Sequence, residues 1–162
     1  MKIRMATAED APAIAAIYNF YVQNSIATFE IESVGESEMR RRVSEILESY
    51  PFLVCEENGE ILGYASASLY KTRPAYRHSV EISVYLKNGT EGKGVGSILY
   101  EHLFAELKTK PVHAIIAGIS LPNEPSVHLH EKFGFEKVAH FREVGFKFGH
   151  WIDVGYWEKI QN

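Results

Sequence analysis

The chain has 162 residues, of which 46% are hydrophobic, which is enough for one domain with its own core and short for two. Its 17 Lys and Arg residues face 21 Asp and Glu residues, which argues against a nucleic-acid partner held by bulk positive charge. No apolar run approaches the length of a membrane span, and acids stand where a signal peptide would have its apolar region, so we expect a single cytoplasmic domain, residues 1–162, with no membrane partner.

The first third of the chain predicts one strand and two helices. Residues 2–6 are expected to form a short strand, and Thr7-Ala-Glu-Asp10 has the form of a capping box before a helix that ends near residue 24. The apolar residues 25–29 are too few for another helix and are interpreted as a loop. Ser37 can cap a second helix, which runs to about residue 49.

The middle of the chain predicts a hairpin, then a strand, a glycine loop and a helix. Residues 52–56 and 61–70 are apolar runs joined by Asn58-Gly59, the strongest short-range signal for a hairpin. Residues 79–86 alternate between apolar and polar side chains, as a strand with one buried face does. The glycine-rich loop after them is followed by apolar residues at helical spacing, to about residue 108.

The last third predicts a strand at 112–119, a short helix at 124–133 capped by Asn123, and two final strands at 137–148 and 151–158. The whole order is β-α-α-β-β-β-α-β-α-β-β. It favours an α/β (α+β) fold with a mixed, mostly antiparallel central sheet and helices on both faces.

The glycine loop is a candidate phosphate site. A glycine-rich turn that leads into a helix presents backbone N–H groups at the positive end of the helix dipole. A P-loop is excluded because Gly96 is followed by Ser-Ile, and Gly92-x-Gly94-x-Gly96 lacks the spacing of a dinucleotide fingerprint. On these residues alone, a tight turn without a ligand stays open. The stretch Glu91-Gly-Lys-Gly-Val-Gly-Ser97, after an alternating strand, resembles the acyl-CoA pyrophosphate loop of the GNAT acetyltransferase superfamily.

Four further stretches resemble one branch of that superfamily, the phosphinothricin and methionine sulfoximine/sulfone acetyltransferases. They lie at residues 17–30, 70–76, 121–131 and 149–157, so the resemblance covers nearly the whole chain, and the predicted order of elements also matches the superfamily. Three positions depart from the pattern. Glu91 stands where the superfamily prefers Gln or Arg, which removes one side chain that could contact phosphate. Tyr70 replaces the usual Trp and Phe148 a frequent His, and these two changes bear on the substrate more than on the reaction.

The resemblance implies acetyl-CoA as the co-substrate and no metal. It places cofactor-binding residues at the end of the central strand, in the glycine loop and at the start of the last helix: Ser83, Val84, Tyr85, Glu91, Gly92, Lys93, Gly94, Val95, Gly96, Ser97, Asn123 and Ser126. Independently of it, His128 and His130 do not make a metal pair, because residues two apart on a helix face different ways. The single Cys55, in an apolar run, is more consistent with a buried strand residue than with a nucleophile.

Two residues are candidates for catalysis, because acetyl transfer to an amine needs a neutral nitrogen and an exit for the thiolate. Glu81 lies on the polar side of its strand, where alternation alone favours an ordinary solvent-facing Glu. The resemblance implies instead that Glu81 is the general base. His130 stands where the wider superfamily commonly has a Tyr that protonates the thiolate, so the resemblance implies an acid or a helper of Glu81. A capping or core histidine is the alternative.

The resemblance also implies a pocket for a small, amino-acid-like substrate. Lys71 and Arg73 would bind its carboxylate or a second polar head, with Tyr76 in the same segment and Phe29 as an apolar wall. The alternatives are that the two charges are simply solvated and that Phe29 only packs.

We therefore predict an acetyl-CoA-dependent N-acetyltransferase that acts directly, in a ternary complex, on the α-amine of a small amino acid or toxic analogue of the phosphinothricin or methionine sulfoximine/sulfone type. The alternatives are a protein or peptide N-acetyltransferase of the same fold and a non-catalytic CoA-binding module. A non-catalytic CoA-binding module would not need a general base at Glu81.

The final two strands also predict self-association. They carry large aromatic side chains on both faces, more than one sheet edge can bury: Phe141, Phe146, Phe148, Trp151, Tyr156 and Trp157. We expect a two-fold symmetric homodimer whose interface includes this hairpin, a state that the resemblance also implies. The alternative is that the second aromatic face folds over the protein's own core.

Overall fold

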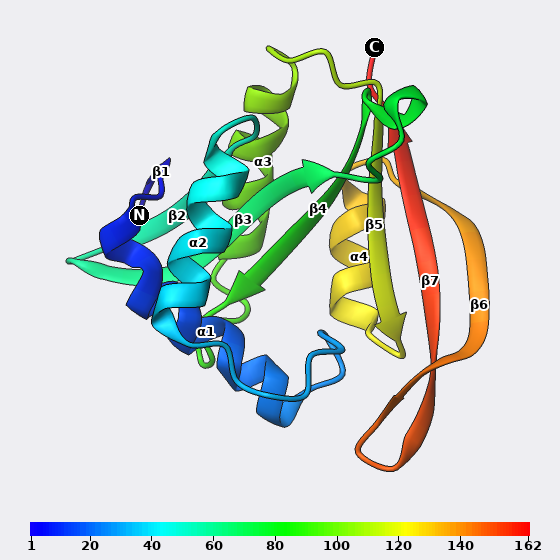
Figure 1. Cartoon of the computed structure of the whole chain (residues 1–162), viewed down its shortest axis with the longest axis horizontal. Helices are drawn as coiled ribbons and strands as arrows, with labels where there is room; N and C mark the ends of the chain where they lie inside the picture. Colours follow the sequence, from blue (N-terminus) through cyan, green and yellow to red (C-terminus); the bar gives the residue numbers. More distant parts are fainter. The chain divides into compact units, whose positions relative to one another are not determined.

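The computed structural model describes residues 1–162 and has seven strands and four α-helices in the predicted order (Figure 1). Two short 3-10 turns, Ala8–Asp10 and Pro74–Tyr76, are additional. The chain divides into two compact units. Unit 1 is made of residues 1–20, 34–68 and 82–111, and unit 2 of residues 21–33, 69–81 and 112–162.

The strands of unit 1 are β1 (Lys2–Met5), β2 (Phe52–Glu57), β3 (Glu60–Leu69) and the second part of β4 (Ser79–Leu86), in that order. β1 pairs with β2, and β2 with β3, in antiparallel fashion. Between β2 and β3, Asn58 and Gly59 have φ values of 53° and 80°. Such left-handed values at both positions are those of a two-residue hairpin turn, so the predicted hairpin is confirmed.

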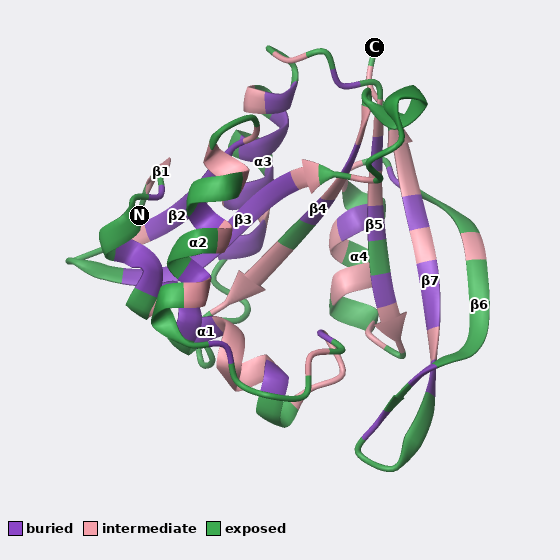
Figure 2. Cartoon of the chain, viewed as in Figure 1, coloured by how far each residue is buried: buried purple, intermediate pink, exposed green.

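Three helices cover these strands, with α1 (Ala11–Asn24) and α2 (Glu36–Leu47) on one face and α3 (Val95–Leu107) on the other (Figure 1). The apolar residues of α3 form a buried face, as their helical spacing predicts. Its largest fully buried side chains, which include the phenol of a tyrosine, are Leu99, Tyr100, Leu103 and Leu107. Buried residues gather on the facing sides of helices and strands within this unit (Figure 2).

The starts of α1 and α2 differ in how well the sequence predicts them. The capping box at Thr7 and Asp10 is present, and the Asp10 carboxylate accepts a hydrogen bond from the Thr7 N–H at 2.8 Å. The expected cap at Ser37 is wrong, because α2 begins two residues earlier, after Gly35. The Gly35 carbonyl accepts from the Met39 N–H at 3.0 Å, and acidic side chains in the first turn favour this earlier start.

Unit 2 contains the first residues of β4, then β5 (Ala114–Leu121), β7 (His150–Ile160) and, at the edge, β6 (Glu136–Lys147). The start of β4 runs parallel to β5, whereas β5 with β7 and β7 with β6 are antiparallel. The sheet is therefore mixed and mostly antiparallel, as predicted.

Helix α4 (Glu124–Lys132) connects β5 with β6; it begins after Asn123, as predicted, and ends one residue before the predicted end. The Asn123 side chain accepts a hydrogen bond from the Ser126 N–H at 3.2 Å, and Gly134, just past the helix, has a φ of 90°. None of the four helices is both long and apolar enough to cross a membrane.

Candidate active site

The glycine loop of unit 1 lies between the end of β4 and the start of α3. Gly92 has a φ of 78° and Gly94 a φ of 81°, values that favour glycine. A Cβ added at either residue would meet no atom within 4 Å, so the loop backbone faces open space. Gly94 is the residue before α3, whose first turn points backbone N–H groups out of the helix end. The loop can therefore receive the phosphates of a ligand.

Side chains of the loop itself hold it in this shape. The hydroxyl of the buried Thr90 donates to the Lys87 carbonyl at 2.6 Å, and Glu91 Oε2 accepts from the Gly89 N–H at 2.8 Å. Glu91, where the superfamily prefers Gln or Arg, thus folds the loop through its own carboxylate. Lys93 is exposed and is the one cation within 91–97.

The three predicted cofactor residues before the loop lie on β4 in unit 1. The Tyr85 ring packs between Tyr18 and Tyr64, at centroid distances of 5.3 Å and 5.6 Å. Tyr85 is therefore anchored by its neighbours, whereas Ser83 is exposed and Val84 partly so.

Glu81 lies in unit 2, on β4, and is paired with Ile116 of β5. Its side chain is half-buried, and burial raises the pKa of its carboxyl. A Cβ added at Gly118, two residues further along β5, would lie 3.6 Å from Glu81 Oε2 and 3.1 Å from Tyr156 Cε1. The Glu81 carboxylate and the Tyr156 ring thus both approach the space above this glycine. Burial, the Glu81 charge and Tyr70 together raise the pKa of Tyr156.

The predicted substrate segment, which follows β3, is a small cluster of aromatic rings and a cation. The rings of Tyr70 and Tyr76 meet edge to face at a centroid distance of 5.7 Å. The Lys71 ammonium lies over both, 5.4 Å from the centre of Tyr70 and 5.9 Å from that of Tyr76. Lys71 and Arg73 are exposed, so both can reach a ligand from solvent. The Tyr70 N–H donates to the carbonyl of Ser79, two residues before Glu81, at 3.1 Å, so the segment begins close to the start of β4.

His130 is 4% exposed at the end of α4. Its Nδ1 lies 2.7 Å from the Ser126 carbonyl, which can only accept, so Nδ1 carries the proton. The ring also packs edge to face on Phe135, at 5.4 Å between centroids. Burial lowers the pKa of His130, which favours the neutral ring. These contacts are those of a core histidine that ties down the helix.

Phe29 and Lys147 join the loop after α1 to β6. The Phe29 ring covers Gly145, where an added Cβ would come within 2.4 Å of its Cζ. The ammonium of Lys147, a residue only 4% exposed, donates to the carbonyls of Ser25 and Thr28 at 2.7 Å each, and to that of Tyr21 at 3.4 Å.

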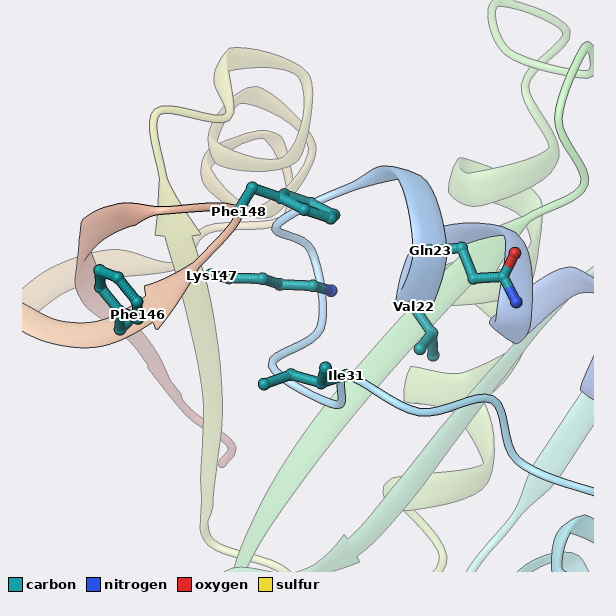
Figure 3. Close-up of a pocket in the computed structure, with 6 residues that line it drawn as sticks. All are labelled: Val22, Gln23, Ile31, Phe146, Lys147 and Phe148. Atoms are coloured by element: carbon teal, nitrogen blue, oxygen red, sulfur yellow. The ribbon is translucent and has the colours of Figure 1, made fainter.

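A pocket of about 350 Å³ lies beside this junction. Lys147 extends from β6 toward the loop, with Phe148 beside it, and the remaining lining side chains come from α1, the loop and β6 (Figure 3). They are Val22, Gln23, Ile31 and Phe146.

Sequence reasoning missed Gly118, Tyr156 and Lys147. Tyr156 lies within the stretch 149–157 that resembles the acetyltransferase branch, but nothing local says that it meets Glu81. Lys147 had a local signal, because it is a cation between two phenylalanines on a strand. No group of three or more His, Cys, Asp or Glu side chains could hold a metal ion, and Cys55 is buried in β2, as expected.

Comparison with known proteins identifies a family over nearly the whole chain. Residues 3–155 match the family model described as an acetyltransferase (GNAT) domain. The phosphinothricin N-acetyltransferase of Streptomyces coelicolor is 40% identical, over 98% of this chain and 95% of its own. The L-methionine sulfoximine/L-methionine sulfone acetyltransferase of Salmonella typhimurium is 36% identical, over 96% of this chain and 92% of its own.

Two solved structures have nearly the same backbone. A phosphinothricin acetyltransferase from Sinorhizobium meliloti in complex with AcCoA has a TM-score of 0.96 at 36% identity, covering 99% of this chain and 88% of its own. A ribosomal-protein-alanine N-acetyltransferase from Brucella melitensis also has a TM-score of 0.96 at 36% identity, covering 99% of this chain and 100% of its own.

Proposed function

Because the chain belongs to the GNAT acetyltransferase family, we propose that it transfers an acetyl group from acetyl-CoA to the α-amine of a small amino acid or of a toxic analogue. The analogues named by its relatives are phosphinothricin and methionine sulfoximine or sulfone. The observation that carries the proposal is the half-buried Glu81, whose carboxylate has a raised pKa and lies in the same unit as the Lys71 segment.

The glycine loop supports acetyl-CoA as the co-substrate. Its backbone at Gly92 and Gly94 is open to a ligand, and the start of α3 favours negative charge. We assign the diphosphate to residues 91–97, with Ser83, Val84 and Tyr85 beside the acyl arm. Asn123 and Ser126 are further candidates for that arm, although both also make hydrogen bonds that hold α4.

Glu81 is proposed as the general base. An α-ammonium has a pKa of about 8 and is mostly protonated near neutral pH, so it must lose a proton before it can attack. A carboxylate with a raised pKa accepts that proton more readily than an ordinary one. The nitrogen then forms a bond to the acetyl carbon as the carbon–sulfur bond breaks, and the thiolate leaves and takes up a proton.

His130 is proposed as a positioning residue rather than as the acid. In its neutral form the Nδ1 proton is already donated to Ser126, and the lowered pKa disfavours the charged form that an acid needs. Lys71 and Arg73 are proposed to bind the substrate carboxylate, with Tyr76 holding Lys71 and Phe29 forming an apolar wall.

One solved neighbour is named as a ribosomal-protein-alanine N-acetyltransferase, which keeps a protein substrate as the second candidate. The test is thiol release from acetyl-CoA with free methionine sulfone, the same compound blocked as an amide, and a peptide that begins with alanine. We expect activity on the free amino acid and a large loss on the amide, because Lys71 and Arg73 would lose the carboxylate. Preference for the peptide would replace the proposed substrate. Binding of CoA without any thiol release would indicate a non-catalytic module.

We also infer a homodimer, in the cytoplasm. The support for self-association is the exposed apolar surface of the last hairpin, where Trp151 is 65% exposed and Phe146 is 55% exposed.

A further inference from the structure

The pairing of the strands in unit 2 puts Glu81, Gly118 and Tyr156 on one face. Glu81 is opposite Ile116 across β4 and β5, and Gly118 is opposite Tyr156 across β5 and β7. Ile116 and Gly118 are two apart on β5 and so share a face. Gly118 is the residue of β5 that is exposed on this face, whereas Ile115, Ala117 and Ile119 of the other face are buried.

Gly118 is where the two side chains come together. An added Cβ there would lie 3.1 Å from Tyr156 Cε1, closer than ordinary van der Waals contact, and 3.6 Å from Glu81 Oε2. The Tyr156 ring therefore leans over the glycine toward the carboxylate. Phe141 of β6 also packs edge to face on the Tyr156 ring, at 5.7 Å between centroids, and this contact restricts the ring's movement.

We propose that Tyr156, seated over Gly118, is a positioning residue for Glu81: its ring shields one side of the carboxylate from water and leaves the open face for the amine. This inference rests on the proposed acetyltransferase function and adds the residues that tune its base. It also gives Gly118 a defined role, because a Cβ there would require the Tyr156 ring to shift by a few tenths of an ångström.

Few charged groups face Glu81 from the neighbouring strands. β5 contributes no charged side chain on this face, and β7 contributes Tyr156 and, opposite Ile116, Glu158. The end of β3 contributes Tyr70, with Lys71 over its ring. Burial is the cause of the raised pKa of Glu81. The direction in which removal of the Tyr156 ring changes this pKa therefore follows. Removal should bring water to the carboxylate and lower its pKa.

The experiment is a carbon-13 NMR titration of the glutamate side chains in the full-length protein without ligand, with Glu81 assigned by its absence in Glu81→Gln. We expect Tyr156→Ala to lower the pKa of Glu81 by about half a unit or more, toward the ordinary value of about 4.3. Tyr156→Phe keeps the ring and should keep the pKa. Tyr50→Ala, which removes a tyrosine from unit 1, is the matched control and should change nothing.

The pH profile of kcat/KM gives the second readout. The acidic limb should move to lower pH in Tyr156→Ala and stay in place in Tyr156→Phe. Gly118→Ala, checked for folding by circular dichroism, should lower kcat at least about tenfold through the displaced ring. An unchanged Glu81 titration in Tyr156→Ala overturns the inference, as does an equal shift in Tyr156→Phe, which would assign the effect to the hydroxyl. Absence of any thiol release by the wild-type protein would overturn the proposed function instead, because the titration does not depend on activity.

Discussion

At the scale of single residues, the two catalytic candidates differ in the form that their surroundings favour. Glu81 is half-buried on an open face, and burial shifts its pKa upward, toward the range where a carboxylate works as a base. His130 is buried and hydrogen-bonded through Nδ1, and burial shifts its pKa downward, toward a ring that stays neutral. Opposite shifts of this kind support the proposal that Glu81 transfers the proton and that His130 has a structural role.

Replacement of Glu81 tests the base. Glu81→Gln keeps the size and polarity of the side chain but cannot accept the proton, so turnover should fall by on the order of 10²–10⁴-fold. Acetyl-CoA affinity should hardly change, since Glu81 is not among the residues proposed to bind the cofactor. The acidic limb of the pH profile should disappear. Near-normal turnover of the mutant between about pH 6 and pH 9 would refute the role.

His130 predicts a dependence of stability on pH. Its folded-state pKa lies below the ordinary value of about 6.5, so the unfolded chain takes up the proton first as the pH falls. Stability contributed by the neutral ring is therefore complete above about pH 7 and declines as the pH falls through 6.5 toward the folded-state pKa.

The measurement is the free energy of unfolding of wild type and His130→Gln between about pH 7 and pH 5. The mutant should lose less stability over this range than the wild type. His128→Gln, an exposed histidine on the same helix, is the control and should keep the wild-type slope. Identical slopes in all three proteins would contradict the assignment of a neutral, buried His130.

At the scale of elements, the glycine loop and the α1–β6 junction are each held in shape by hydrogen bonds from a few side chains. The loop keeps its shape through Thr90 and Glu91, so its glycine backbone stays open to a ligand. The junction depends on one buried ammonium, that of Lys147, which binds the carbonyls at the end of α1 and in the loop before Phe29.

Gly94 tests the loop. Gly94→Asp should abolish measurable acetyl-CoA binding, because the carboxylate would stand against the diphosphate at the start of α3. The fold should survive, since an added Cβ meets nothing within 4 Å and Asp tolerates a φ of 81° better than most residues. Gly94→Asn has the same shape without the charge and should retain more affinity. Calorimetry with CoA that finds wild-type affinity in Gly94→Asp would exclude the loop as the diphosphate site.

Lys147 tests the junction. Lys147→Met keeps the length of the side chain but leaves the carbonyls of Ser25 and Thr28 without this donor, which should cost about 1–3 kcal/mol of unfolding free energy. KM for the amino acid should also rise, because the loop carries Phe29. Lys2→Met, an exposed lysine on β1, should affect neither quantity. If urea denaturation gave equal stabilities for the two variants, the bonds of Lys147 would not be what holds the junction.

The elements themselves could be predicted from the sequence, whereas the contacts between them could not. Alternation along β4, the turn at Asn58-Gly59 and the cap at Asn123 are local signals, and each appears in the structure as expected. The meeting of Glu81 with Tyr156 depends on two strand registers that bring together residues far apart in the chain. The carboxylate of Glu91 folds the loop through a hydrogen bond to Gly89, and no pattern indicated it.

At the scale of the whole molecule, the last hairpin leaves apolar surface that the chain does not cover. The rings of Phe146 and Trp151 pack in a tilted arrangement at 4.7 Å between centroids, yet both residues are more than half exposed. Val138, Phe141, Val144 and Phe148 add exposed apolar side chains on the same two strands and the turn between them. The alternative reading of the sequence, in which these aromatic groups fold over the core, therefore fails for all but Trp157 and the partly buried Tyr156. Surface of this kind usually marks an interface.

A second copy of the chain is the partner we expect on this hairpin, since a two-fold interface pairs the same patch with itself. Sedimentation at micromolar concentration should give about twice the 18.4 kDa of one chain. Trp151→Glu puts a charge at the most exposed ring of the hairpin and should shift the protein to monomer, because a buried unpaired carboxylate is costly. Met5→Glu, at an exposed apolar residue of β1, should leave the dimer intact. A wild-type protein that sediments as a monomer while fully active would overturn the dimer, and equal dissociation of both variants would move the interface away from the hairpin.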